Sequence, residues 1–189
     1  MQLRFCLLFF MVILQTGCIS AAVMGGRAIY DHNDVSNTLS TQEIAYDASK
    51  TINNDPKLKD VADISVSNYN NLLLLTGTVP SASLKSRAMS LARSTHGVAR
   101  IYNGITVGPL QSAWAETQDT WLTSKVKTSM VASSGISPSN FKVVTSHGIV
   151  YLMGAAPRDQ VKKAVQIAKS TDGVKKVVNL MYYVNLSTS

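Results

Sequence analysis

Apolar and polar positions follow one order of helix and strand twice along this chain. The first half predicts a helix ending near residue 53, strands from residue 64 and over residues 72–75, a helix at 81–95 and a strand at 98–107. The second half predicts a helix at 120–132, strands at 141–145 and 149–153, a helix at 158–170 and a strand at 174–184. Each half is therefore expected to fold as helix–strand–strand–helix–strand.

Direct similarity between the halves indicates two copies of one small domain. Residues 91–98 read LARSTHGV and residues 167–174 read IAKSTDGV, with one change of residue class. Two glycines recur at offsets of 77 and 76 positions, namely Gly77 with Gly154 and Gly97 with Gly173. A self-match of this length predicts a tandem repeat. Each copy has roughly 65 residues, a size at which one core is only marginally stable, so mutual support between the copies is expected.

The repeat defines an α+β protein with two similar domains. Each copy is expected to place two helices on one face of a small three-stranded mixed sheet. Asp119 or Thr120 is the expected N-cap of the second copy's first helix, because their side-chain oxygens can accept from free backbone N–H groups. The predicted division is 1–17 signal peptide, 18–40 tether, 41–108 first domain, 109–118 linker and 119–185 second domain, with Trp114 in the linker.

The N-terminus reads as an export signal. Arg4 is followed by ten apolar residues, which are too few for a membrane span of ~20 residues but suit a signal peptide. Small residues just before Cys18 resemble a lipoprotein cleavage site, after which Cys18 carries acyl chains. The position three before that cysteine holds Gln15 where Leu is usual. An ordinary signal peptide cut nearby and an uncleaved anchor remain the alternatives.

Cleavage before Cys18 has two consequences. It removes Cys6, so no intramolecular disulfide can form and both domains depend on packing alone. The acyl chains would hold the protein at a membrane, at ~0.8 kcal/mol per buried CH₂. No Asp follows Cys18, since the next residues are Ile19 and Ser20, and this favours onward transport to the outer membrane with the protein facing the periplasm.

The charge of the chain belongs mainly to the second copy. The net charge is +7 with a pI near 9.5. Residues 110–189 carry nine Lys or Arg against four Asp or Glu, whereas residues 18–109 carry eight against seven. Such a surface suits nucleic acid, an anionic membrane or an acidic protein. Export argues against nucleic acid.

These features together resemble a known family. An apolar strand ending in glycine and a later Gly-Val step occur twice, at residues 75–77 with 95–98 and at 152–154 with 171–174. They resemble BON domains, and residues 1–185 resemble the dual-BON outer-membrane lipoproteins of Gram-negative bacteria. Residues 119–127, which read DTWLTSKVK, look like the opening of that family's second domain.

The resemblance implies a non-catalytic protein of two tandem BON domains. It implies that the second domain's first helix binds anionic phospholipid, and that the protein supports envelope integrity near the division site. On that helix, Leu122, Val126 and Met130 lie within about 80° and form the expected core stripe. The residues outside this stripe that are expected to contact phospholipid are Trp121, Ser124, Lys125, Lys127, Thr128 and Val131.

Other interpretations of that helix stay open. Trp121 could pack against the first domain or the linker, with the lysines merely solvated. The same exposed face could instead bind a protein of envelope assembly or cell-wall remodelling, which makes a periplasmic adaptor the alternative function. The matching region of the first domain offers Tyr46 and Lys50 without Trp, so little lipid binding is expected there.

Catalytic and metal chemistry has little support in the sequence. The three histidines, His32, His96 and His147, share no metal-ligand spacing. No serine lies in a nucleophile-elbow motif, and no carboxylate pair has a glycosidase arrangement. We therefore expect no enzyme activity, no cofactor and no metal.

Three minor features complete the expectations. His147 and Gly148 are predicted to form a hairpin turn, which could also lie beside the lipid-binding helix. The lysine doublets at 162–163 and 175–176 are expected to be solvated, with a wider basic surface as the alternative. Tyr182 and Tyr183 alternate in the last strand, which predicts one buried and one exposed ring.

Overall fold

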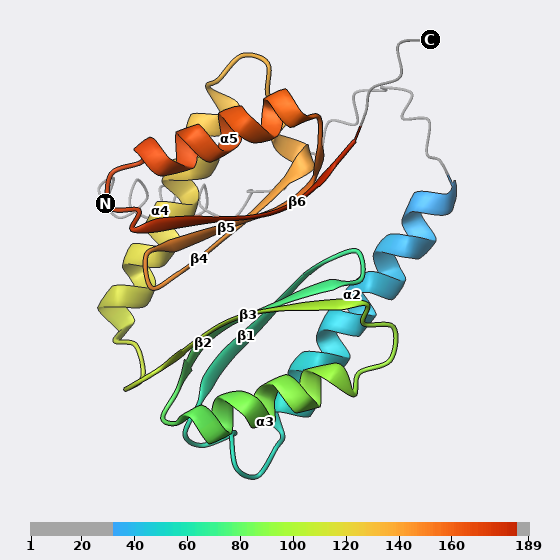
Figure 1. The fold of residues 1–189 in the computed structure, drawn as a ribbon, viewed down its shortest axis with the longest axis vertical. Coiled ribbons are helices and arrows are strands. Elements are labelled where there is room, and N and C mark those ends of the chain that lie inside the picture. Colours follow the sequence, from blue (N-terminus) through green and yellow to red (C-terminus); the bar gives the residue numbers. More distant parts are fainter. Residues whose placement is uncertain (1–31, 185–189) are drawn as a thin grey trace, which may run out of the picture. The chain divides into compact units, whose positions relative to one another are not determined.

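The computed structural model describes residues 32–184, with side chains from residue 42 onward. The predicted signal peptide, Cys18 and most of the predicted tether lie outside these residues. Figure 1 shows the two α+β units. The elements of the first are α2 (His32–Asn53), β1 (Asp63–Tyr69), β2 (Leu72–Val79), α3 (Ala82–Arg93) and β3 (Arg100–Val107). The second comprises α4 (Ala113–Val131), a 3₁₀ turn (Pro138–Asn140), β4 (Phe141–Ser146), β5 (Ile149–Ala156), α5 (Arg158–Ser170) and β6 (Lys176–Tyr183).

Both sheets are mixed and have the same topology. The strand orders are β1-β2-β3 and β4-β5-β6, with the second strand in the centre. The first two strands of each sheet pair antiparallel through a short turn, and the third pairs parallel to the second after the helical crossover. The predicted α+β fold is confirmed, including the helix–strand–strand–helix–strand order of each copy.

Each domain has its own apolar core between its helices and one face of its sheet. The first core contains Ile52, Leu58, Ile64, Leu75, Val79, Ala88, Ala92 and Ile105. The second contains Val126, Met130, Phe141, Val143, Val150, Leu152, Ala156, Val161, Ala164, Ala168 and Met181. The small alanines of α3 and α5 let each helix approach its sheet closely.

The repeated glycine after α3 and α5 explains the Gly-Val motif. Gly97 has φ +82° and Gly173 has φ +95°, a region that L side chains rarely adopt. A Cβ on Gly97 would lie 2.8 Å from Ile44 Cδ1, and one on Gly173 would lie 2.9 Å from Leu122 Cδ2. Glycine therefore lets the chain turn sharply against the first helix of each domain.

The second faces of the two sheets also bury apolar side chains. Leu72 and Leu74 of β2 form a third cluster with Tyr151 and Met153 of β5. The Tyr151 ring meets the edge of Tyr102 at 5.9 Å between centroids, and burial, followed by that neighbour, raises the pKa of Tyr151. Because both faces of β2 are covered, seven of its eight residues are buried, and its first four are all Leu instead of alternating with polar residues.

Two helices begin earlier than the sequence pattern predicted. α2 begins at His32, inside the predicted tether, and α4 begins at Ala113, inside the predicted linker. The predicted N-cap was wrong, because Ser112 caps α4 and its Oγ accepts from Ala115 N at 3.3 Å. Neither early segment contains Gly or Pro, so nothing in the backbone stops the helix from extending toward the N-terminus.

The prediction for the last strand was also wrong. Tyr182 is 37 % exposed and Tyr183 is 48 % exposed, so neither ring is buried. Each ring instead lies beneath a guanidinium group, Arg100 over Tyr182 at 5.2 Å and Arg158 over Tyr183 at 4.6 Å from the ring centroid. Cation–π contacts of this kind stabilise an aromatic ring that stays partly in water.

Candidate functional site

Helix α4 presents one face to its own domain and the other to solvent. Leu122, Val126 and Met130 are buried, as the core stripe predicted. Thr123 Oγ1 donates to Thr145 Oγ1 of β4 at 2.7 Å, which adds a polar tie beside that stripe. These contacts fix the rotation of the helix about its axis, and so they fix which side chains face outward.

The outward face carries all six residues predicted to contact phospholipid. Trp121 is 53 % exposed and Val131 is 69 % exposed. Ser124, Lys127 and Thr128 are exposed as well, and Lys125 is half-buried. The Lys125 ammonium lies 4.5 Å from the centroid of the Trp121 ring. More than half of the indole surface is therefore open, and a cation lies directly on its face.

A third lysine lies near this face. Lys142 is on β4, and its Nζ donates to Asn68 O at 2.9 Å. Burial, and then the charge of Lys127, lowers the pKa of Lys142. The two ammonium groups thus repel each other, although they belong to different elements. Sequence reasoning did not identify Lys142, because no spacing rule links it to Lys127.

The buried carboxylate of Asp119 holds α4 against the β4–β5 turn. It accepts from His147 N and Gly148 N, each at 2.7 Å, and from Gln111 Nε2 at 2.6 Å. His147 has φ +58° and Gly148 has φ +75°, and the flanking strands pair antiparallel, which confirms the predicted hairpin turn. The bonds to Asp119 place this turn beside α4. Asp119 thus acts as a clamp two residues before Trp121, where an N-cap had been predicted.

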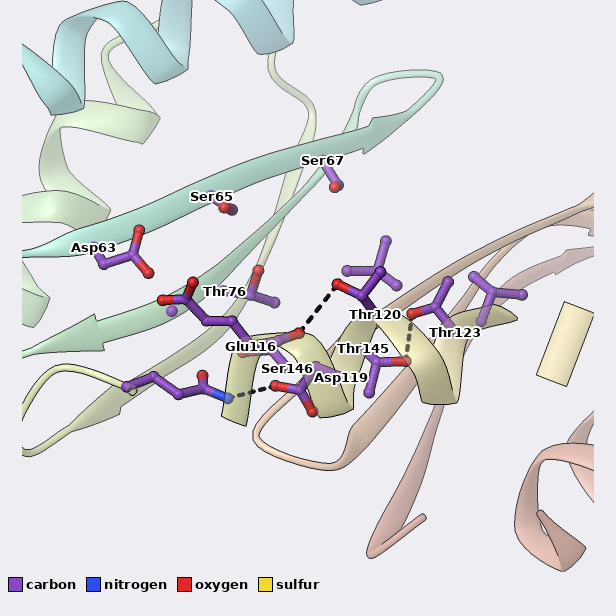
Figure 2. Close-up of a pocket in the computed structure, with 14 residues that line it drawn as sticks. Asp63, Ser65, Ser67, Thr76, Glu116, Asp119, Thr120, Thr123, Thr145 and Ser146 are labelled. Atoms are coloured by element: carbon purple, nitrogen blue, oxygen red, sulfur yellow. Dashed lines mark hydrogen bonds between the residues drawn. The ribbon is translucent and has the colours of Figure 1, made fainter. Parts of the chain in front are cut away.

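A polar cavity of about 460 Å³ lies between β1 and α4 (Figure 2). Carboxylates of Asp63 and Glu116 face it, and hydroxyl groups supply most of the remaining lining. The hydroxyl residues are Ser65, Ser67, Thr76, Thr120, Thr123, Thr145 and Ser146. Within the residues that the structure describes, no group of three or more His, Cys, Asp or Glu side chains could hold a metal ion.

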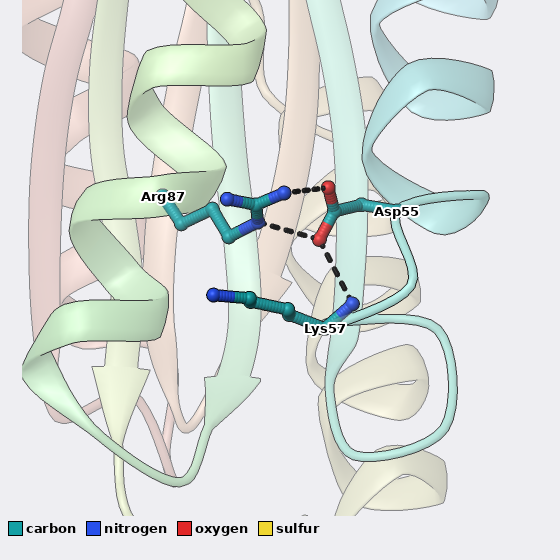
Figure 3. A network of polar contacts seen from close by, with 3 residues as sticks. All are labelled: Asp55, Lys57 and Arg87. Atoms are coloured by element: carbon teal, nitrogen blue, oxygen red, sulfur yellow. Dashed lines mark hydrogen bonds and ion pairs between the residues drawn. The ribbon is translucent and has the colours of Figure 1, made fainter.

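A separate polar network lies in the first domain (Figure 3). The Arg87 guanidinium donates to both carboxylate oxygens of Asp55, at 2.7 and 2.6 Å, and Lys57 N donates at 3.1 Å. The Arg87 hydrogen bonds, against a smaller opposing effect of burial, lower the pKa of Asp55. This bidentate pair ties the loop after α2 to α3 and has the character of a structural ion pair.

Within residues 32–184, no helix combines the length and the apolar character needed to cross a bilayer.

Comparisons with known proteins identify the repeated unit. The BON domain model matches residues 40–109 and 118–185. The chain is 29 % identical over 177 residues to the outer membrane lipoprotein DolP of Haemophilus influenzae, covering 92 % of each chain. It is 33 % identical over 150 residues to a 21 kDa hemolysin of Actinobacillus pleuropneumoniae, covering 79 % of this chain and 75 % of that one.

A third relative is the osmotically-inducible protein Y of Escherichia coli. It is 29 % identical over 150 residues, which cover 78 % of this chain and 74 % of that one. The two matched segments contain both sheets and most of the residues of their helices, so the repeat seen in the sequence is the repeat of that domain. The chain belongs to the BON domain family and carries two BON domains in tandem.

Proposed function

We propose that this protein is a non-catalytic outer-membrane lipoprotein that binds anionic phospholipid through the exposed face of α4. Its similarity to an outer membrane lipoprotein over 92 % of both chains supports an outer-membrane-associated envelope protein. The finer proposal adds a lipid anchor at Cys18, orientation toward the periplasm, and a role in envelope integrity near the division site. The contact residues are Trp121, Ser124, Lys125, Lys127, Thr128 and Val131.

One observation carries the lipid-binding proposal. An indole that is 53 % exposed lies beside an ammonium group at 4.5 Å, on a helix whose opposite side is buried in the core. Indole rings favour the level of the lipid headgroups, and each nearby Lys adds ~1 kcal/mol on an anionic surface. Trp121 and Lys125 can therefore contact the apolar and the charged layers of one leaflet at once.

Vesicle flotation tests this proposal directly. The chain from residue 19 onward keeps the compact unit that begins at His32 and removes any acyl anchor. We expect it to float with vesicles containing phosphatidylglycerol and not with phosphatidylcholine alone. Raising the ionic strength from about 0.1 M to about 1 M shortens the screening length from about 10 to about 3 Å and should release the protein.

Two variants make the test specific to α4. Trp121→Ala should abolish flotation, whereas Tyr46→Ala removes an aromatic ring that is 66 % exposed on α2 and should leave flotation unchanged. Equal binding to both vesicle types, or none to either, would reject the lipid proposal. The second result would favour the periplasmic adaptor, in which the same helix face binds an envelope protein.

The anchor has its own test. Cells that make the full-length protein can be fed an alkyne-tagged fatty acid, and the purified protein can then be examined for the tag. We expect labelling of the natural protein and none of Cys18→Ala. Labelling that survives this substitution would overturn the proposed site of acylation without affecting the α4 proposal.

A further inference from the structure

Trp114 lies on the same helix as Trp121, and not in a linker. Ser112 caps α4, so Trp114 is the second helical residue, and it is 71 % exposed. Seven residues separate the two tryptophans, which corresponds to about 20° around the helix axis and about 10.5 Å along it. The two indoles therefore extend from one side of α4, one two turns beyond the other.

The carboxylates of α4 point elsewhere. Glu116 lines the polar cavity opposite Asp63, as Figure 2 shows, and Asp119 is buried against the β4–β5 turn. Glu116 lies about 160° around the helix from Trp114. The side of α4 that carries both indoles thus has no acidic group that would repel an anionic surface.

Three hydroxyl groups on the outward face are already hydrogen-bonded within the helix. Thr117 Oγ1 donates to Ala113 O at 2.9 Å, Thr120 Oγ1 to Glu116 O at 3.0 Å and Ser124 Oγ to Thr120 O at 3.1 Å. A hydroxyl that donates to the carbonyl four residues earlier needs no water as acceptor. Transfer of this face from water to a lipid surface therefore leaves no side-chain donor of these residues unsatisfied.

We propose that Trp114 is a second membrane anchor, and that α4 lies along the bilayer surface over its full length. This inference rests on the proposed function and extends it from the C-terminal half of α4 to its first turn. The occupant is an anionic bilayer, because two aligned indoles are followed on the same side by Lys125, whose ammonium lies on the Trp121 ring. A helix of 19 residues in this orientation spans about 28 Å of the surface.

The chain contains only two tryptophans, so each can be observed alone. Trp121→Phe leaves Trp114 as the sole indole, and Trp114→Phe leaves Trp121. The chain from residue 19 onward, in each variant, is mixed with phosphatidylglycerol vesicles whose acyl chains carry bromine. We expect both indoles to shift their emission to shorter wavelength and to be quenched by the bromine atoms.

The outcomes separate the two proposals. Quenching of Trp121 without quenching of Trp114 overturns the second anchor and leaves the proposed function intact. If neither indole is quenched, lipid binding by α4 itself is rejected.

Partitioning gives an independent measure of the second anchor. Trp114→Ala should weaken binding to phosphatidylglycerol vesicles roughly tenfold, the loss expected if about 55 Å² of apolar indole surface is buried at ~25 cal/mol per Å². Its thermal unfolding should be unchanged, because the side chain is mostly exposed. The matched control is Tyr46→Ala, which should bind as the unsubstituted chain does. An unchanged affinity for Trp114→Ala would overturn the inference.

Discussion

The first helices of the two domains occupy equivalent places but present opposite surfaces. Ile44 of α2 and Leu122 of α4 each lie against the glycine that follows the second helix, which sets an offset of 78 positions between the two helices. At that offset Glu43 corresponds to Trp121, and Asp47 corresponds to Lys125. The core positions Ile44, Ala48 and Ile52 correspond to Leu122, Val126 and Met130, so they stay apolar. At the outward positions of Glu43 and Asp47, an acidic residue is replaced by an aromatic and by a basic one.

This difference shows that the fold and the proposed function depend on separate positions. The inward face of each helix is constrained by packing at near-crystalline density, so its residue types vary little. The outward face is not constrained by packing within its domain and is free to change. An anionic bilayer would repel the acidic face of α2 and attract the aromatic and basic face of α4. One fold can therefore supply one inert and one binding domain.

The domains also differ in how the second helix is tied to the loop after the first. In the first domain, Arg87 of α3 forms a bidentate ion pair with Asp55. In the second domain, Lys163 of α5 donates to the backbone carbonyl of Ser134. The place of the contact is kept while its chemistry changes from an ion pair to a charge–dipole hydrogen bond.

The largest expected effect comes from giving α4 the residues of α2. Trp121→Glu combined with Lys125→Asp should weaken binding to phosphatidylglycerol vesicles about a thousandfold, at ~1 kcal/mol for each unit of charge changed and a similar amount for lost indole burial. Flotation or a partition titration measures this. Unfolding should be little changed, since both side chains lie on the outer face.

The reciprocal change sharpens the same comparison. Glu43→Trp combined with Asp47→Lys, made in the Trp121→Glu, Lys125→Asp chain, should restore part of the affinity through α2. No recovery would mean that the outward face alone does not determine binding, and that the surroundings of α4 contribute as well.

A smaller effect is expected at Asp119, whose equivalent by the same offset is Thr41. Asp119→Ala removes the acceptor of three N–H donors and leaves His147 N and Gly148 N without their partner. We expect a loss of about 2–3 kcal/mol in the free energy of unfolding, because buried donors would lose their hydrogen bonds. Urea unfolding measures it, with Thr41→Ala as the control. A loss below about 0.5 kcal/mol, typical of an unimportant surface position, would contradict the clamp.

Lys127 should contribute less to binding than the Trp121–Lys125 pair. Lys127→Ala is expected to weaken vesicle binding about fivefold, the equivalent of ~1 kcal/mol for one charge. It should also raise the pKa of Lys142, because the charge of Lys127 helps to lower it. Lys50→Ala in α2 serves as the matched control. An unshifted Lys142 pKa, followed by NMR, would show that the two ammonium groups are not neighbours.

The smallest effect is an acid sensitivity confined to the first domain. The pKa of Asp55 is lowered from its ordinary value of 3.8 by Arg87. Its contribution is therefore fully present above that ordinary value and is lost as the pH falls through the lower folded pKa. Solvent reaches the partly exposed Arg87 and limits the gain, so we expect a modest loss of stability below pH 3.8.

Urea unfolding between pH 2 and about pH 6 compares the natural chain with Arg87→Ala. The substituted chain should lose this part of the acid dependence. Lys163→Ala in the second domain should keep it, because a carbonyl acceptor does not titrate. An identical acid dependence in the natural and Arg87→Ala chains would contradict the role of the ion pair.

The sequence alone was sufficient for the domain count, the order of elements and the core stripe of α4. These follow from local rules, because alternation, helical periodicity and a repeated Gly-Val step are properties of neighbouring residues. Leu122, Val126 and Met130 were predicted to be buried and are buried. The same stripe placed Trp121 outside the core without any knowledge of the rest of the fold.

Tertiary structure decided the features that join distant residues. The start of α4 at Ala113 depends on the cap at Ser112, and only this extension brings Trp114 into phase with Trp121. The role of Asp119 depends on a turn that lies 28 positions away in the sequence. Lys127 acts on the pKa of Lys142 only because β4 packs beside α4. Periodicity describes one element at a time, whereas caps, clamps and charge clusters arise where elements meet.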